Sequence, residues 1–174
     1  MLENLINLVK SHAGDAIINN SDIPNERNDE AIQLASENIF QGLQKAFSSG
    51  NNEGIGIENL VSLFSKGGTP ANNQISQGIQ NSVVQGLIKQ FGLGESKAGN
   101  IASMLIPVVM NQLVNKTNDP NDNSFDLQDI FNKVSGGKTG GVDIGSLINQ
   151  FSGNKDEVKP GSGLLDSLKG LFGR

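Results

Sequence analysis

One glycine-rich stretch contains the residue types of a phosphate-binding loop. Residues 135–141 read SGGKTGG. The triplet Gly137, Lys138 and Thr139 matches the end of such a loop. The full pattern also requires a strand before the loop and a glycine at the position of Asn132. Because the pattern predicts a helix before this stretch, we interpret it as a connection between two short helices.

A second stretch imitates the opening of a calcium-binding loop. Asp119, Asn121 and Asn123 stand at alternate positions, as oxygen ligands do in an EF-hand. The turn glycine of that loop is replaced by Ser124, and its bidentate glutamate falls on Ile130. Side chains of Asp and Asn also close turns by binding nearby backbone amides, which explains the same residues. We therefore predict a turn here and no tight metal site, with weak calcium binding at residues 119–126 as the open alternative.

The other candidates for catalysis have no partners in the sequence. His12 is the only histidine, and the chain has no cysteine, so thiolate chemistry and cysteine metal sites are excluded. Residues 94–98, GESKA, fall one residue short of a serine-nucleophile elbow and are more simply the start of a helix.

Four carboxylates gather around the predicted start of the second helix. Negative charge at this position is stabilised by the helix dipole, and a metal site would need histidine or better-converging ligands. We predict no catalytic, cofactor-binding or metal-binding residue in the chain, and no enzyme. The four are Asp22, Glu26, Asp29 and Glu30.

The first half of the chain has apolar residues at helical spacing. They predict one helix over residues 2–19 and another after the stretch NNSDIPN, in which Pro24 disfavours helix at the residue before it. Ser21 or Asp22 can cap the second helix. Its predicted inner face consists of Ala31, Leu34, Ala35, Leu43, Ala46 and Phe47.

The next two predicted helices follow the stretch KGGTPANN. The first has apolar residues at steps of four from Ile75 to Phe91 and should be closed by Gly92 as a C-cap. The second covers about residues 95–116, and we expect a kink at Pro107 because proline lacks the amide hydrogen that a helix interior needs.

A short amphipathic pattern occurs at residues 54–68, 124–137 and 141–153. What recurs is the helix cap, an apolar staple, the inner face and a glycine stop. In the second copy Asp126 is the predicted N-cap, with Phe125 and Ile130 as the staple.

The longer helices also correspond in spacing. Residues 31–47 match residues 98–114, so that Ala31 pairs with Ala98. We predict an all-α, multihelical fold with two tandem units, each a helical hairpin plus a short helix. The predicted duplicated domain covers residues 1–153, with units at about 1–68 and 69–137 and a third short helix at 142–152. A polar linker at 154–163 and an amphipathic helix at 164–174 follow.

Composition narrows the classes of partner. The net charge of −5 and the absence of Trp and Tyr argue against nucleic-acid binding, which relies on Lys, Arg and aromatic side chains. The first residues lack the basic segment and cleavage site of a signal peptide, and the longest apolar run is far shorter than a membrane span. We expect a cytoplasmic protein.

Four stretches resemble the YidB-like family of bacterial proteins of unknown function. They are MLENLINLVKSHAGDAII, IPNERNDEAI, QFGLGESKAGNIASMLIPVVMNQL and the closing GLLDSLKGLFGR. The similarity covers most of residues 1–137 and, more loosely, the end of the chain. It implies an all-α multihelical fold and a bacterial origin, and it supplies no catalytic residues.

Three functional hypotheses remain. The first is an interaction or self-assembling scaffold protein that uses its short amphipathic helices, with a protein partner or a second copy as the ligand. The second is association with a membrane surface through the C-terminal helix. The candidate interaction face of this helix is Leu165, Leu168 and Phe172, and the chain's own domain, a second copy and a membrane surface are the alternatives for what it contacts. DNA binding through paired helices is the third and the least favoured, because of the net charge.

Overall fold

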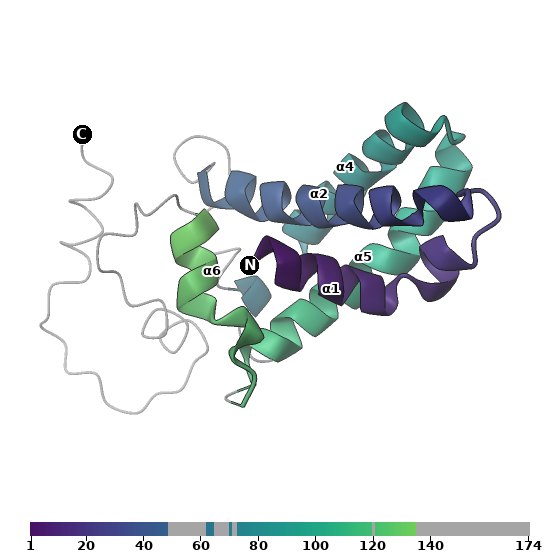
Figure 1. Ribbon diagram of the computed structural model, residues 1–174. Helices are drawn as coiled ribbons and strands as arrows, with labels where there is room; N and C mark the ends of the chain where they lie inside the picture. Colours follow the sequence, from purple (N-terminus) through teal and green to yellow (C-terminus); the bar gives the residue numbers. More distant parts are fainter. Residues whose placement is uncertain (49–61, 65–69, 71–72, 120, 135–174) are drawn as a thin grey trace, which may run out of the picture.

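All regular secondary structure in the described part of the chain is helical in the computed structural model (Figure 1). The structure describes residues 1–48, 62–64, 70, 73–119 and 121–134. No strand occurs within these ranges. The predicted all-α fold is therefore confirmed.

Two helices form the front layer in Figure 1. Helix α1, Leu2–His12, contacts helix α2, Asn28–Ser48. Their connection contains a π-helical turn η1, Gly14–Ile18, and a 3-10 turn η2, Asn25–Arg27. This α1–α2 layer is the first helical hairpin.

A second hairpin lies behind the first. Helix α4, Gln74–Phe91, turns sharply into helix α5, Glu95–Thr117, and the two helices pack on each other. We call this pair the α4–α5 layer. The 3-10 turn η5, Asn123–Phe125, and the short helix α6, Leu127–Val134, follow it.

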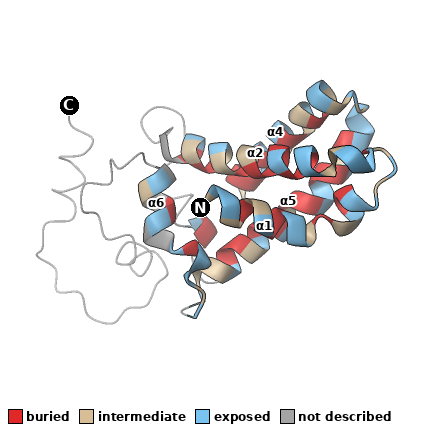
Figure 2. Cartoon of the chain, viewed as in Figure 1, coloured by how far each residue is buried: buried red, intermediate tan, exposed pale blue. Residues whose placement is uncertain are grey.

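The two layers face each other. Helix α2 packs on α4, α1 packs on α5, and α6 packs against α2 near the N-terminus (Figure 1). Burial follows this arrangement, because buried positions lie where the helices meet and exposed positions lie on the outward sides (Figure 2). The α4–α5 layer thus has an inner surface against α1 and α2 and an outer surface turned away from them.

Glycines permit a close approach between α2 and α4. A Cβ atom added at Gly42 of α2 would lie 2.2 Å from Cγ1 of Ile79 on α4. In the opposite direction, a Cβ at Gly86 of α4 would lie 3.0 Å from Cδ1 of Leu34 on α2. Each helix therefore has a glycine where an apolar side chain of its neighbour needs the space.

The first helix is shorter than the predicted 2–19. Helix α1 ends at His12, and the amides of Ile18 and Asn19 donate five residues back, to the carbonyls of Ala13 and Gly14. This wider π turn keeps Ala13 and Ile17 in the core and leaves Ile18 on the surface. The prediction missed it because a π turn changes the phase of the apolar pattern locally.

The second helix begins later than predicted. It starts at Asn28 after the 3-10 turn, and the capping role expected of Ser21 or Asp22 is wrong. Pro24 has the extended backbone that ends one segment and precedes the next. Instead of capping a helix, Asp22 forms an ion pair with Lys97 at the start of α5. The Lys97 Nζ lies 2.5 Å from the Asp22 Oδ1.

The second hairpin agrees more closely with the sequence. Gly92 ends α4 in a left-handed conformation with φ 66°, and its amide donates to the Ile88 carbonyl at 3.0 Å, which confirms the predicted C-cap. Helix α5 continues on both sides of Pro107, so the expected kink does not divide it.

The second copy of the short motif has its predicted start. Asp126 Oδ1 accepts the amide hydrogen of Asp129 at 3.0 Å, which confirms Asp126 as the N-cap of α6. Phe125 and Ile130 are both 3% exposed, as an apolar staple requires. Of the first copy only residues 62–64 are described, and the third copy lies outside the described residues.

The tandem duplication stays a prediction. Ala31 and Ala98, which the alignment of the two halves pairs, are both fully buried. Burial of both alanines agrees with equal spacing in α2 and α5, but it does not establish that one unit arose from the other.

Candidate functional site

Three of the predicted features fall where the structure gives no description. The candidate interaction face of Leu165, Leu168 and Phe172 lies outside the described residues, as does the glycine-rich stretch at 135–141. The polar linker at 154–163 lies there as well. The site is therefore built from the four long helices and the loop that follows α5.

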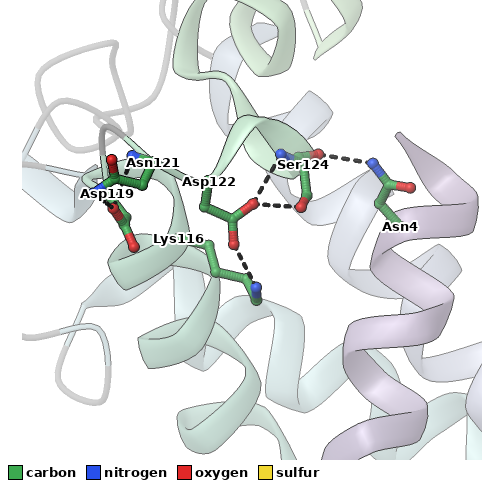
Figure 3. A network of polar contacts seen from close by, with 6 residues as sticks. All are labelled: Asn4, Lys116, Asp119, Asn121, Asp122 and Ser124. Atoms are coloured by element: carbon green, nitrogen blue, oxygen red, sulfur yellow. Dashed lines mark hydrogen bonds and ion pairs between the residues drawn. The ribbon is translucent and has the colours of Figure 1, made fainter.

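The loop after α5 has the Asx turns that its sequence predicted (Figure 3). Asp119 Oδ1 accepts the amide hydrogen of Asn121 at 2.9 Å. Asp122 Oδ1 accepts the amide hydrogen of Ser124 at 2.9 Å and also accepts from the Ser124 hydroxyl. These bonds direct the two carboxylates toward their own turns, so the predicted turn chemistry is present.

A lysine occupies the second oxygen of Asp122. Lys116 Nζ lies 2.5 Å from Asp122 Oδ2, and hydrogen bonds from Lys116 and then Ser124 hold the pKa of this carboxyl well below its usual range. The amide nitrogen of Asn4 donates to the Ser124 carbonyl at 2.7 Å, which ties the loop to α1 (Figure 3). The arrangement is a structural tie, because a cation would have to displace the lysine ammonium.

Three of the four carboxylates near the start of α2 pair with different cations. Asp29 pairs with Lys10 at 3.1 Å, and Glu30 pairs with Arg27 at 2.8 Å. Among the described residues no group of three or more His, Asp or Glu could hold a metal ion.

Arg27 joins this region to the turn of the second hairpin. Its guanidinium lies 4.2 Å from the ring centroid of Phe91 and donates to the Gln90 carbonyl at 3.1 Å. Together with the Asp22–Lys97 pair, these contacts hold the α1–α2 connection against the α4–α5 turn.

The lone histidine and the elbow-like stretch have structural positions. His12 is half-buried at the end of α1. Gly94 is the residue before α5, and its carbonyl accepts the Ala98 amide at 3.0 Å. The stretch GESKA is thus a helix start, as predicted.

The surface that distinguishes this molecule was not predicted. Between residues 73 and 115 the ionisable side chains are Lys89, Glu95 and Lys97, which all lie near the turn between α4 and α5. The one other ionisable side chain of the two helices is Lys116, in the last turn of α5, which pairs with Asp122. We define the α4–α5 outer surface by the exposed residues of the two helices away from this turn. On α4 they are Gln74, Gln77, Gly78, Asn81, Ser82 and Gln85. On α5 they are Asn100, Ser103, Met104, Val108, Asn111 and Asn115.

The α1–α2 layer has the opposite character. Residues 1–48 contain seven acidic and three basic side chains. This difference can be found in the sequence, because the number of charged residues differs sharply between the two hairpins. Only the layered fold shows that the charged hairpin covers one side of the molecule and the nearly uncharged hairpin covers the other. The acidic residues are Glu3, Asp15, Asp22, Glu26, Asp29, Glu30 and Glu37, and the basic ones are Lys10, Arg27 and Lys45.

The described helices do not have the properties of membrane-spanning segments. None of them combines the length and the apolar character that a bilayer crossing requires. This finding concerns only the part of the chain that the structure describes.

Comparison with known proteins gives one match. Residues 73–174, which include the α4–α5 layer and α6, match a family model described as bacterial protein of unknown function (DUF937). Curated proteins and solved structures gave no match. The match supports the expected bacterial protein of unknown function, while the narrower YidB-like grouping remains a resemblance. Because the family model covers more than half of the chain, this protein belongs to the family of bacterial proteins of unknown function, DUF937.

Proposed function

We propose that this chain is a helical protein-interaction module, and not an enzyme, that self-associates or binds a protein partner. The observation that carries the proposal is the uncharged α4–α5 outer surface. Depletion of charged residues and enrichment in methionine distinguish the centres of protein interfaces from the rest of protein surfaces.

Apolar side chains lie within this uncharged surface. Met104 is 52% exposed and Val108 is 43% exposed, one helical turn apart on α5. Covering them removes apolar area from water, and burying the neighbouring amides costs less than burying ions. The surface can therefore be desolvated by a protein partner at modest cost.

The burial of the apolar staple at the short helix α6 changes where we expect the partner to bind. The sequence favoured the short amphipathic helices as the interaction elements. However, Ile130 of α6 and its staple partner Phe125 of η5 are both buried in the protein's own core. That apolar face already stabilises the fold, so the α4–α5 outer surface is the better candidate among the described residues.

The polar groups of the described residues support a non-enzymatic role. Asp22, Asp29 and Asp122 each form an ion pair with a lysine. Among the described residues no ion pair involves His12, and the chain has no cysteine. General acid–base work needs a proton-transferring group held near a substrate site. These carboxylates instead join one element to another.

Chemical cross-linking in bacterial cells that express the full chain tests the proposal. We expect discrete cross-linked species that contain the chain and are heavier than the monomer. Detection of monomer alone over a range of cross-linker doses, while a known oligomer in the same cells is cross-linked, would contradict an interaction module. The membrane-surface alternative predicts a different result, since the chain would then sediment with membranes without a discrete protein adduct.

A further inference from the structure

We infer that the α4–α5 outer surface is the docking site for a second copy of this chain. The inference rests on the proposed function and narrows it to one partner and one surface. Four observations carry it: the charge on each layer, the side-chain amides of α4, the apolar centre on α5 and the size of the surface.

Charge decides between the two sides of the molecule. In a two-fold symmetric dimer the same patch of each copy meets its own image. The α1–α2 layer, with seven acidic and three basic side chains, would repel its image. The exposed residues of the α4–α5 outer surface carry no charge, because Lys89, Glu95 and Lys97 lie near the turn at one end. At the other end of α5, Lys116 is half-buried and paired with Asp122.

The exposed amides of α4 make the surface complementary to itself. Asn81 and Gln85 are exposed four residues apart and so lie on one stripe along the helix. A side-chain amide both donates and accepts hydrogen bonds. Two copies of this stripe can therefore satisfy each other's polar groups, which two acidic or two basic stripes cannot do.

The exposed apolar residues of α5 supply the attraction. Met104 and Val108 stand one turn apart on the outward side of α5, with Asn100 and Asn111 one turn before and after them. Methionine is flexible and polarisable, so it adapts to a facing surface that includes its own image.

The size of the surface predicts a weak dimer. Helix α4, with 18 residues, is about 27 Å long, and two helices side by side are about 20 Å wide, which gives a face of about 540 Å². A stable interface buries about 800 Å² on each partner. We therefore expect a reversible dimer that dissociates on dilution, with a dissociation constant in the micromolar range or weaker.

Light scattering of the full chain, measured over about a hundredfold range of concentration, tests the inference through three variants. Met104→Glu places a charge on the apolar centre, and Gln85→Glu places one on the α4 stripe. The matched control is Gln41→Glu on α2, because Gln41 and Gln85 are both exposed helical glutamines that precede a lysine by four residues.

The expected pattern is specific to the surface. The mass of the wild type should rise with concentration, Met104→Glu should lower the association constant about tenfold or more, and Gln85→Glu should lower it less. Gln41→Glu should associate like the wild type. Circular dichroism and thermal unfolding confirm that each variant is folded, as we expect for substitutions at exposed positions.

Two results would overturn the inference. A wild type that stays monomeric at every concentration would show that this surface does not bind a second copy. The surface would then contact another protein or residues 135–174 of the same chain. A wild type that associates while Met104→Glu and Gln41→Glu behave alike would place the interface elsewhere. In both cases, cross-linked adducts in the cellular experiment would still support the proposed interaction module. Failure of the self-association inference can therefore be distinguished from failure of the proposed function.

Discussion

The two helical hairpins of this protein share one core but differ on their outer surfaces. The α1–α2 layer has charges along its whole length and uses several of them in ion pairs with neighbouring elements. The α4–α5 layer has its charges near the turn and at the far end of α5, where Lys116 pairs with Asp122. Both layers bury apolar residues in the core, so packing does not explain the difference. We propose that a contact made by the uncharged side explains it.

The comparison predicts that the layers contribute alike to the core. Leu43 of α2 and Leu105 of α5 are both essentially fully buried. Replacement of either by alanine should lower the free energy of unfolding by about 2–5 kcal/mol, through lost burial and the cavity that remains. Urea unfolding measures the loss, and a marked difference between the two variants would show that one layer folds without the other.

Close approach of the layers gives the next largest effect. Gly42→Ala places a methyl group against Ile79 and should destabilise the protein by about 1–3 kcal/mol, although alanine favours helix. Gly78→Ala on α4 is the matched control, because nothing lies within 4 Å of its added Cβ atom. That variant should be stabilised by about 0.5–1 kcal/mol. If Gly42→Ala were stabilised as well, the tight contact between α2 and α4 would be wrong.

Acid should act on the loop after α5. The folded pKa of Asp122 is depressed by Lys116 and Ser124, so its stabilising contribution is complete above the usual aspartate pKa of about 3.9 and is lost as pH falls below that value. Asp122→Asn should therefore be less stable than the wild type at neutral pH, and the difference should shrink in acid. Urea unfolding at a series of pH values measures it.

A surface carboxylate provides the control for the acid experiment. Asp15 forms no ion pair among the described residues, so Asp15→Asn should not show a difference that disappears in acid. A gap between Asp122→Asn and the wild type that persists unchanged at low pH would contradict the role given to the Lys116 contact.

Salt should have the smallest effect. The screening length falls from about 10 Å at 0.1 M salt to about 3 Å at 1 M, which weakens contacts between exposed charges. Association through the α4–α5 outer surface should change less than about twofold between these concentrations, since that surface is uncharged away from the turn. Association that strengthens strongly with salt would instead implicate the acidic α1–α2 layer.

Local signals in the sequence predicted much of this fold. The apolar spacing of α4 and α5, the Gly92 stop and the Asp126 cap each depend on neighbouring residues, so they could be read along the chain. The end of α1 could not, because its π turn around Ala13 departs from the regular helical period.

Long-range contacts account for the other differences. Asp22 was expected to cap α2, but it meets Lys97, which lies 75 residues away in the chain. The uncharged surface was missed for a related reason. Its residues are ordinary glutamines, asparagines and serines, and they form a distinctive surface only when α4 and α5 lie together on one side of the molecule.

The central claim is that copies of this chain meet through the α4–α5 outer surface, and a charge-swap experiment tests it most directly. Met104→Glu and Met104→Lys are purified separately and their masses are measured by light scattering, alone and as an equal mixture at the same total concentration. We predict that each variant alone stays near the monomer mass, because its charge repels its image. The mixture should regain dimer, because the charges on the two copies are then opposite. Equal masses for the mixture and for the separate variants would contradict the claim.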